Sequence, residues 1–306
     1  MILLKKKVLV LAGGISAEHS VSLRSGKSVQ SALLLAGYAA DILEIKTVRL
    51  PKNVADYDVV FSVLHGMGGE DGTMQNLLEQ TGVPFVGSDS AASSLCFNKS
   101  RYRDYLLKHS LPVAAGGLVT ADQFWKSDLS ALPYVLKPKN GGSSIDTFIV
   151  HEPSMAPKND IQAAFNRHTE LLAEKLILGV ECTAAVLIDA PLPVIEIIPP
   201  AGQDFDYTNK YNGKTQEICP PQSISKTNQK RIQDLALQIH RQTGCRHYSR
   251  TDMIITKNHE IFVLETNTLP GMTEQSLFPK AAQAAGFSMP MLVDSLVRAA
   301  IRSTPT

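Results

Sequence analysis

Four polar residues near the end of the chain have the types and spacing for metal-dependent chemistry: Arg250, Asp252, Glu265 and Asn267. A hairpin loop of two or four residues centred on positions 258 and 259 places Asp252 opposite Glu265. The same register places Arg250 opposite Asn267. Because side chains alternate along a strand, all four would then lie on one face of the sheet. Two carboxylates that face each other repel, so we interpret this face as the site of a hard cation, most simply Mg2+.

The element that must position these residues is a β-hairpin. Apolar runs at 253–255 and 261–264 flank the polar residues 257–260, a break of the size that joins hairpin strands. Mg2+ held by one or two carboxylates usually keeps its other positions for water and phosphate, so the hairpin suggests nucleotide chemistry. The alternative is a solvated hairpin face with unrelated charges, because a slip of one residue would break the pairing.

Length and composition fit a globular protein of two or three packed units, with 306 residues, 44% of them hydrophobic and 19% charged. The formal net charge of +1 argues against a nucleic-acid partner or a membrane-surface patch. The basic run 5–7 follows apolar residues, the reverse of a signal peptide. No apolar stretch approaches the ~20 residues of a membrane span. We therefore expect neither nucleic acid nor membrane as a partner.

The cysteines indicate a cytoplasmic protein. They are Cys96, Cys182, Cys219 and Cys245, and they form no CxxC motif. This scatter favours small buried thiols in a reducing cytoplasm over disulfides or a zinc site.

The first segment alternates strand and helix patterns and predicts a small open parallel sheet with helices. Two glycine-bearing turns, at 13–14 and 65–66, follow strands of this sheet. Ligands approach open sheets at the carboxyl ends of the strands, so Glu18 and His65 are candidate contacts. For Glu18 the alternative is a carboxylate in the first turn of a helix that only complements the helix dipole. A lone histidine at a strand end is likewise often structural.

The second and third segments each contain a stretch suited to a nucleotide. After a strand that ends at Lys137, the loop 139–144 is rich in glycine and serine and could wrap phosphate oxygens, although such loops are also common in plain hairpins. Glu181 follows an apolar strand and could meet ribose hydroxyls. The long polar stretch 201–219 predicts a lid, with Lys210 and Tyr211 at its middle.

These patterns predict an α/β fold of three units, an N-terminal open parallel sheet followed by two α+β units that clasp a nucleotide. We place the units at residues 1–92, 93–180 and 181–306. The first would bind substrate, the second would bind the nucleotide, and the third would carry the catalytic hairpin.

In this order the chain resembles the D-alanine:D-alanine ligases of the ATP-grasp superfamily over nearly its whole length. The carriers of the resemblance are GGISAEHSVSL at 13–23, LHGMGGEDGTMQ at 64–75, FNKSR at 97–101, LKPKNGGSS at 136–144, EKLILGVE at 174–181, NKYNGKTQ at 209–216, RTDM at 250–253 and LETNTLPGMTEQSL at 264–277. Several separated motifs in the right order are far more specific than any one of them.

The resemblance implies a cytoplasmic enzyme that joins two D-alanines for peptidoglycan precursors. In this family ATP phosphorylates the carboxylate of the first D-alanine, and the amine of the second attacks the acyl phosphate. The implied cofactors are ATP and Mg2+, or Mn2+ in its place, and a homodimer is the implied assembly. Alternatives are a D-alanyl-D-lactate or D-alanyl-D-serine ligase, or a descendant that binds nucleotide without turnover. The Lys210–Tyr211 pair resembles the dipeptide-forming pattern, and the intact hairpin argues against loss of catalysis.

The resemblance also implies roles for the nucleotide and metal residues. It assigns the ATP contacts to Lys99, Lys137, Ser144, Glu174, Lys175, Ile177, Glu181 and Lys210. It assigns the metal to Asp252, Glu265 and Asn267, where it would neutralise charge during phosphoryl transfer.

A further set of residues would hold and activate the two D-alanines. Glu18, hydrogen-bonded with Ser143 and Tyr211, would bind the ammonium group of the first. Ser276 and Leu277 would bind the carboxylate of the second, and His65 is a further substrate contact. Arg250 and the backbone N–H of Gly271 would stabilise the oxyanion of the tetrahedral intermediate.

Two residues depart from the family pattern. Gly141 stands where an acidic residue is usual, and Asp146 stands where a glycine is usual. We expect Gly141 to loosen the loop and Asp146 to stiffen the next turn and add negative charge near the phosphates. ATP binding should therefore be weaker than in a standard member, and glycine at 146 should tighten it. Thr251 replaces an apolar residue and should face away from the metal.

Overall fold

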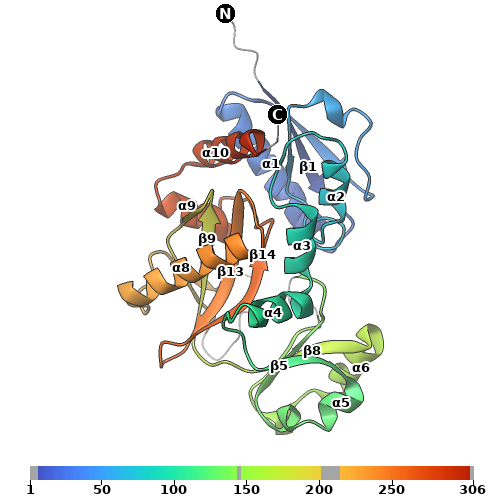
Figure 1. The fold of residues 1–306 in the computed structure, drawn as a ribbon, viewed down its shortest axis with the longest axis vertical. Coiled ribbons are helices and arrows are strands. Elements are labelled where there is room, and N and C mark those ends of the chain that lie inside the picture. The colour runs from blue at the N-terminus through green and yellow to red at the C-terminus, as the bar shows by residue number, and fades with distance from the viewer. Residues whose placement is uncertain (1–5, 143–145, 201–213, 304–306) are drawn as a thin grey trace, which may run out of the picture.

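Three β-sheets follow one another along the long axis of the molecule (Figure 1). The computed structural model describes residues 6–142, 146–200 and 214–303. A parallel sheet comes first in the chain and two antiparallel sheets follow. This confirms the expected α/β class with an N-terminal open parallel sheet. The boundaries at 92/93 and 180/181 stay a prediction.

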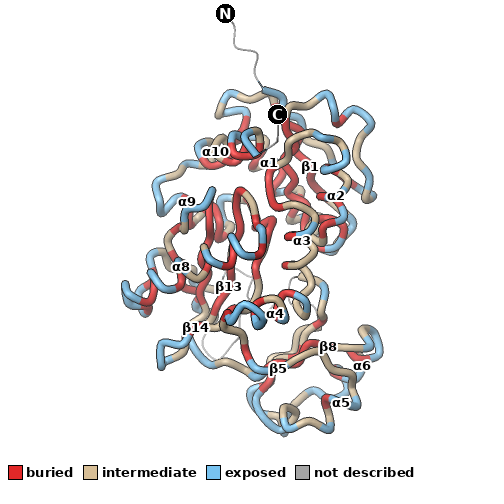
Figure 2. The backbone as a smooth tube through the Cα atoms, in the orientation of Figure 1, coloured by how far each residue is buried: buried red, intermediate tan, exposed pale blue. Residues whose placement is uncertain are grey.

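The N-terminal sheet has the strand order β2-β1-β3-β4, with every pairing parallel. Its elements are β1 (Lys7–Gly13), α1 (His19–Leu35), β2 (Ala39–Ile45), a 3-10 turn (Val54–Asp56), β3 (Val59–Ser62), α2 (Thr73–Glu79) and β4 (Phe85–Val86). β1 and β3 read as continuous apolar runs because helices and loops cover both faces of a parallel sheet. Beyond the exposed Lys7, every residue of β1 is buried (Figure 2).

Two helices lead out of this sheet: α3 (Ser90–Phe97) and α4 (Lys99–Lys108). The side chain of Asn98 accepts a hydrogen bond from the backbone N–H of Arg101 and so caps α4. The cap fixes Lys99 as the first residue of the helix. The backbone N–H of Lys99 also donates to the carbonyl of Lys139 at 2.8 Å, which ties the helix start to the loop after β6.

The central sheet is antiparallel, in the order β5-β8-β6-β7. Its elements are β5 (Gly116–Thr120), α5 (Ala121–Trp125), a 3-10 turn (Asp128–Ala131), β6 (Tyr134–Lys137), β7 (Phe148–Val150), a 3-10 turn (Pro153–Met155), α6 (Lys158–His168) and β8 (Glu170–Lys175). Phe124, Tyr134 and Phe165 pack together in a core that belongs to this sheet alone.

The third sheet is antiparallel, in the order β12-β11-β9-β13-β14, with β10 paired to β9. Its elements are β9 (Val180–Leu187), β10 (Ala190–Pro191), β11 (Ile195–Ile198), β12 (Gln216–Ile218), α8 (Lys226–Gln242), β13 (Tyr248–Ile255), β14 (Ile261–Asn267), α9 (Leu277–Ala284) and α10 (Met289–Arg302). β9 and β13 lie inside the sheet and are largely buried (Figure 2).

The last helix returns to the first sheet. α10 packs against α1, β3 and β4, and one apolar core contains Val29 of α1 together with Val293 and Val297 of α10. The first and third expected units therefore share a core, and Figure 1 shows α10 beside α1. No single helix in the described part of the chain is long and apolar enough to cross a membrane; α9 and α10 reach that size only as a pair bent by 101°.

The β13–β14 hairpin has the expected pairs but a different turn. Arg250 pairs with Asn267 and Asp252 with Glu265, as predicted. Further along, Ile255 pairs with Ile261, so the loop has an odd number of residues, and the two or four expected were wrong. The register shifts between Asp252 and Met253, because Leu264 is one extra residue on β14. This bulge restores the expected pairing at the polar end.

Candidate active site

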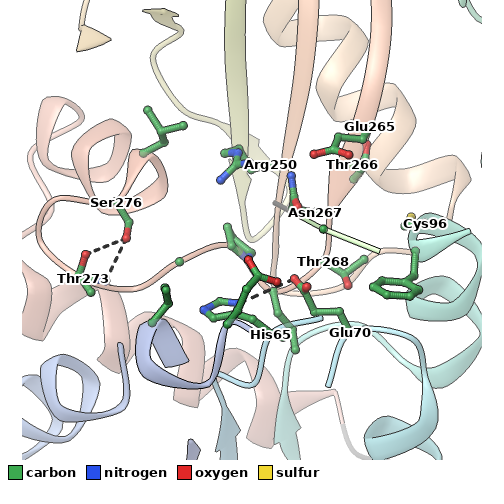
Figure 3. Close-up of a pocket in the computed structure, with 18 of the residues that line it drawn as sticks. His65, Glu70, Cys96, Arg250, Glu265, Thr266, Asn267, Thr268, Thr273 and Ser276 are labelled. Carbon is green, nitrogen blue, oxygen red and sulfur yellow. Dashed lines mark hydrogen bonds and ion pairs between the residues drawn. The ribbon is translucent and has the colours of Figure 1, made fainter. Parts of the chain in front are cut away.

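A cavity of about 690 Å3 lies where the N-terminal sheet, the loop after β6 and the β13–β14 hairpin meet (Figure 3). Nine of the residues expected to bind substrate, ATP or metal or to take part in catalysis line it: Glu18, His65, Lys99, Arg250, Glu265, Asn267, Gly271, Ser276 and Leu277. Residues from four separate stretches of the chain thus face one space. Asp252 lies beside this cavity, in contact with Arg250 and Asn267.

The N-terminal sheet brings Glu18 to the cavity. β1 ends at Gly13 and Gly14 follows it, both with a φ near +93°, a left-handed conformation that glycine adopts readily. Glu18 then occupies the N-cap position of α1 and not its first turn, the position that the alternative interpretation required. A Cβ atom on Gly142 would lie 3.0 Å from Oε2 of Glu18. Glycine at 142 therefore lets the loop after β6 approach the Glu18 carboxylate closely.

His65 follows β3 and is buried in the cavity wall. Its Nδ1 lies 3.8 Å from Oε1 of Glu70, and Oε2 of Glu70 accepts a hydrogen bond from the backbone N–H of Gly66. Burial lowers the pKa of His65, but the interaction with Glu70 and the charge of Glu18 outweigh it and raise the pKa above its ordinary value. Nε2 of His65 has no hydrogen-bond partner among the described residues.

Arg250 and Asp252 form a bidentate ion pair on the hairpin face. Nε and Nη2 of Arg250 donate to the two carboxylate oxygens of Asp252 at 2.8 and 2.7 Å. Oγ1 of Thr183 donates to Oδ1 at 2.6 Å, and Nδ2 of Asn267 donates to Oδ2 at 3.3 Å. Burial lowers the pKa of Arg250, and the Asp252 charge more than offsets this and raises it. Arg250 is therefore a fixed cation at the cavity wall.

Lys99 connects the hairpin to the loop after β6. Its ammonium lies 3.2 Å from Oε2 of Glu265 and donates to the carbonyl of Gly141 at 2.7 Å. The two facing carboxylates, Asp252 and Glu265, thus each have a cationic side chain as partner. Their mutual repulsion does not by itself require a metal ion, contrary to our argument from the sequence.

The donor set still fits a hard cation. Glu265 and Asn267 line the cavity, Asp252 contacts Asn267, and all three carry oxygen donors. No group of three or more His, Cys, Asp or Glu side chains gathers as a metal site within the described ranges, and this set has only two carboxylates and an amide. The Asp252 oxygens already accept four hydrogen bonds, so a metal ligand role requires one donor to move.

The segment before α9 forms the wall facing the hairpin. Ser276 is the N-cap residue of α9 and Leu277 its first residue. Oγ of Ser276 lies 2.8 Å from Oγ1 of Thr273 and accepts a hydrogen bond from the backbone N–H of Thr273 (Figure 3). The start of a helix carries partial positive charge and free N–H groups, so this wall suits a carboxylate.

The expected ATP residues on the central sheet lie outside the cavity lining. Nζ of Lys137 lies 2.8 Å from Glu174, which is buried, and Nε of Arg103 lies 3.6 Å from the same carboxylate. Lys175 ends β8 with an exposed side chain, Ile177 follows it and Glu181 lies on β9. Four expected residues lie outside the described ranges: Ser143, Ser144, Lys210 and Tyr211.

Asp146 takes a left-handed backbone conformation, with φ +54°. Its carboxylate accepts hydrogen bonds from Arg167 at 2.6 and 3.2 Å and lies 2.7 Å from Nε2 of His168 at the end of α6. The hydrogen bonds from Arg167 lower the pKa of Asp146, burial opposes this, and His168 adds to the lowering. The negative charge that we expected near the phosphates is therefore neutralised locally.

The sequence analysis missed three residues that contact expected site residues: Glu70, Thr183 and Arg103. Glu70 could have been found, because it shares the glycine-rich turn of His65. Thr183 could not, because it meets Asp252 only through the pairing of β9 with β13, across 69 positions of sequence. Thr251 faces away from the cavity as expected, and its hydroxyl contacts that of Thr266 at 2.9 Å.

The fold and the site define an α/β enzyme of the ATP-grasp type. Residues 119–298 match the family model described as D-ala D-ala ligase C-terminus, and residues 41–88 match the one described as D-ala D-ala ligase N-terminus. The chain belongs to the D-alanine–D-alanine ligase family.

Curated relatives and solved structures agree with this assignment. The D-alanine–D-alanine ligase of Xanthobacter autotrophicus is 42% identical, over 95% of this chain and 97% of its own. That of Desulforudis audaxviator is 40% identical, over 96% and 98%. The Bacillus anthracis ligase complexed with ATP superposes with a TM-score of 0.84 at 29% identity, covering 97% and 98%. The VanG D-Ala:D-Ser ligase of Enterococcus faecalis gives 0.81 at 29%, covering 97% and 100%.

Proposed function

We propose that the protein joins two D-alanines to D-alanyl-D-alanine, with conversion of ATP to ADP and phosphate. One observation carries the proposal: a single cavity holds the Glu18 carboxylate, the Arg250 guanidinium and the start of α9. These groups complement an ammonium, a developing oxyanion and a carboxylate, the three charges that amide formation between amino acids presents.

The first D-alanine would bind on the side of the N-terminal sheet. Glu18 accepts hydrogen bonds from its ammonium group, and the fixed carboxylate sets the position of the α-carbon. His65 lines the same wall with its buried Nε2 unpaired among the described residues, so this nitrogen can bind a carboxylate oxygen of the substrate. A fixed ammonium, carboxylate and methyl position selects one chirality, so L-alanine should be a poor substrate.

The second D-alanine would bind against α9. The backbone N–H of Leu277, at the positive end of the helix, and the hydroxyl of Ser276 would hold its carboxylate. Its amine then faces the carbonyl carbon of the activated first D-alanine. When the amine attacks, charge develops on the carbonyl oxygen, and Arg250 with the N–H of Gly271 stabilises it. Asp252 keeps the guanidinium in place through two hydrogen bonds.

The nucleotide would lie between the central and third sheets. Lys99 and Lys137 are placed to neutralise phosphate oxygens, and each would exchange its present carboxylate partner for ATP. Glu174, Lys175, Ile177 and Glu181, on and after β8, would meet the adenine and ribose. Ser144 and Lys210, outside the described residues, are assigned to the phosphates by resemblance only.

Asp252, Glu265 and Asn267 would hold Mg2+, or Mn2+ in its place. When bound there, such an ion would supply positive charge to the phosphoryl transfer. Lys99 and Arg250 pair with these carboxylates in the protein alone, which keeps the face close to neutral. We further propose that the protein works in the cytoplasm, since ATP and the reducing conditions that suit its four cysteines are found in that compartment. The resemblance to the family implies that it forms a homodimer.

A second candidate is a ligase that accepts D-serine, because the VanG D-Ala:D-Ser ligase superposes over nearly the whole chain. Its acceptor differs from D-alanine by one hydroxyl, which binding alone rejects only weakly in an apolar pocket. Product analysis rather than ATP turnover must therefore decide between the two.

The test measures phosphate release from purified protein with ATP and Mg2+. The conditions compared are no amino acid, D-alanine, L-alanine, D-alanine with D-serine, and D-alanine with D-lactate, with products identified by mass. Release that requires D-alanine and yields its dipeptide, even with D-serine or D-lactate present, supports the proposal. A predominant mixed product identifies the second candidate. ATP binding without D-alanine-dependent release would refute both and leave a regulatory nucleotide-binding protein.

A further inference from the structure

Two thiols that the proposed ligation does not use meet behind the cavity wall. Cys96 lies in the last turn of α3 and Cys245 in the turn between α8 and β13, 149 positions apart in sequence. Their sulfur atoms are 4.0 Å apart. Both residues belong to one apolar core, and both thiols are free. Small shifts of the chain could therefore bring the sulfurs to bonding distance.

The two thiols differ in their surroundings. The hydrogen bond from the Cys96 thiol lowers the pKa of Cys245 against the effect of burial, and the hydroxyls of Thr243 and Ser88 beside it act in the same direction. The same hydrogen bond, followed by burial, raises the pKa of Cys96. The lowered pKa favours the thiolate form at Cys245, and the raised pKa favours the protonated form at Cys96. One nucleophilic thiol next to one protonated thiol is the arrangement of a redox-sensitive pair.

We propose that Cys96 and Cys245 form a peroxide-sensitive site that closes to an intrachain disulfide. The Cys245 thiolate attacks one oxygen of hydrogen peroxide, and the O–O bond breaks. Hydroxide departs from the peroxide, and Cys245 becomes a sulfenic acid. The Cys96 sulfur then attacks the sulfur of the sulfenic acid, the S–S bond forms, and the leaving oxygen departs as water with the Cys96 proton. Overall, two thiols are oxidised by two electrons and one peroxide is reduced to two waters.

The cavity brings small molecules to one member of the pair. Cys96 lines the cavity that holds Arg250 and Asn267, and Figure 3 shows it at the edge of this space. Cys245 is not part of the cavity lining, and its sulfur lies 4.0 Å from that of Cys96, so the oxidant must pass Cys96 to reach it. Cys182 is buried in β9, and burial raises its pKa, which keeps it a protonated and weak nucleophile.

Disulfide formation should move the cavity wall. The sulfurs must approach from 4.0 Å to about 2.05 Å, a shift close to 2 Å. The chain continues from Cys96 through Phe97 to Lys99, whose ammonium contacts Glu265 and Gly141. A displacement there should cost at least about tenfold in the rate of ligation. This consequence rests on the proposed function, whereas disulfide formation does not.

The first experiment treats the full-length protein with hydrogen peroxide, blocks remaining thiols with N-ethylmaleimide in denaturant, and measures intact and peptide masses. We expect a loss of two hydrogens, two thiols left to alkylate, and a crosslinked peptide pair containing Cys96 and Cys245. Dithiothreitol should restore four alkylated thiols. Four alkylated thiols after oxidation, a crosslink through Cys182 or Cys219, or a crosslink between two chains would overturn the proposal.

Serine variants assign the order of the two steps. Cys96→Ser should stop at a sulfenic acid on Cys245, trapped by dimedone, and Cys245→Ser should leave Cys96 unmodified. Cys219→Ser is the matched control, half-buried and in a turn elsewhere, and should form the Cys96–Cys245 bond as wild type does. Sulfenic acid on Cys96 in place of Cys245 would contradict the assignment. If a variant fails to fold, the peptide map of the wild-type protein decides alone.

The activity measurement separates this proposal from the proposed function. Oxidised wild-type protein should release phosphate with ATP and D-alanine at least about tenfold more slowly, and dithiothreitol should restore the rate. The Cys219→Ser variant should respond in the same way. If the disulfide forms and the ligation rate stays the same, the proposed displacement of the cavity wall is wrong, whereas the peroxide-sensitive site at Cys96 and Cys245 stands. Reduced protein without ligase activity refutes only the proposed function.

Discussion

Two ion pairs of this molecule lie in different settings. Arg250 and Asp252 pair in the cavity wall, and Arg167 of α6 and Asp146 before β7 pair at what we call the outer end of the central sheet. In the wall, the side chains of Arg250 and Asp252 are 17% and 12% exposed and share two short hydrogen bonds. At the outer end, the side chains of Arg167 and Asp146 are 53% and 20% exposed, with contacts of 2.6 and 3.2 Å. Similar distances therefore conceal unequal energies, because water screens the outer pair more than the inner one.

The largest effect should follow from Asp252→Asn in the wall. The variant leaves the buried Arg250 guanidinium without its counter-charge and removes an expected metal ligand. We expect the free energy of unfolding to fall by about 2–4 kcal/mol. The rate of D-alanine-dependent phosphate release should fall by at least about 10³-fold. Urea denaturation and initial rates measure the two quantities.

The matched control for this variant is Asp234→Asn. Asp234 pairs with Lys230 on the exposed face of α8, at 2.6 Å. Its loss should change stability by no more than about 0.5 kcal/mol and leave the rate unchanged. Equal stabilities of the two variants would show that burial does not make the Arg250–Asp252 pair stronger than an exposed pair.

A smaller effect should follow from Gly271→Ala. The added Cβ atom would lie 2.8 Å from Oγ of Ser276, so the serine must rotate away from Thr273. The backbone N–H of residue 271 stays in place, so kcat should change little. The KM for the second D-alanine should rise about tenfold, the effect of roughly one lost hydrogen bond. Gly117→Ala, on β5 with nothing near its Cβ position, is the control and should change neither constant.

A pH effect should follow from the pairing of His65 with Glu70. Because the folded pKa of His65 is raised, its protonation stabilises the fold below the unfolded pKa of about 6.5, and this contribution is lost as pH rises through the folded pKa. Glu70→Gln should lower the pKa of His65, which NMR titration of the imidazole measures. His240, whose pKa burial lowers to about 4, is an internal control and should not respond. An unchanged His65 pKa would mean that Glu70 does not set it.

The cavity wall shows how far sequence reasoning reaches. The pairs across the β13–β14 hairpin could be predicted because a turn of the chain brings both strands together. They came out right although the loop was wrong, since the bulge at Leu264 offsets the odd loop. Partners of these residues from distant strands, such as Thr183, depend on the order of strands in the sheet, which alternation of side chains does not encode.

The outer end shows the opposite case. Gly141 and Asp146 could be recognised as departures, but the effect of the Asp146 charge was misjudged because α6 brings Arg167 and His168 to it. No periodicity predicts which residue at the end of a helix will meet a loop. The N-terminal parallel sheet itself was predictable, because strands covered on both faces read as continuous apolar runs.

The smallest effect should follow from changes at Asp146. Asp146→Gly removes a residue from a left-handed conformation and also releases Arg167 and His168, two groups that can carry positive charge. Both changes favour ATP, but the ion pair already offsets the carboxylate, so the KM for ATP should fall by only about two- to threefold. ATP titrations of the initial rate measure this change.

Asp146→Asn separates the two causes. Asparagine tolerates the left-handed conformation and lacks the charge. If charge dominates, Asp146→Asn should lower the KM for ATP as much as Asp146→Gly does; if backbone conformation dominates, only the glycine variant should. An unchanged KM in both variants would show that this end of the central sheet does not influence the nucleotide. A fall beyond about tenfold in either would place Asp146 with the buried charges of the cavity wall, because a screened ion pair cannot have so large an effect.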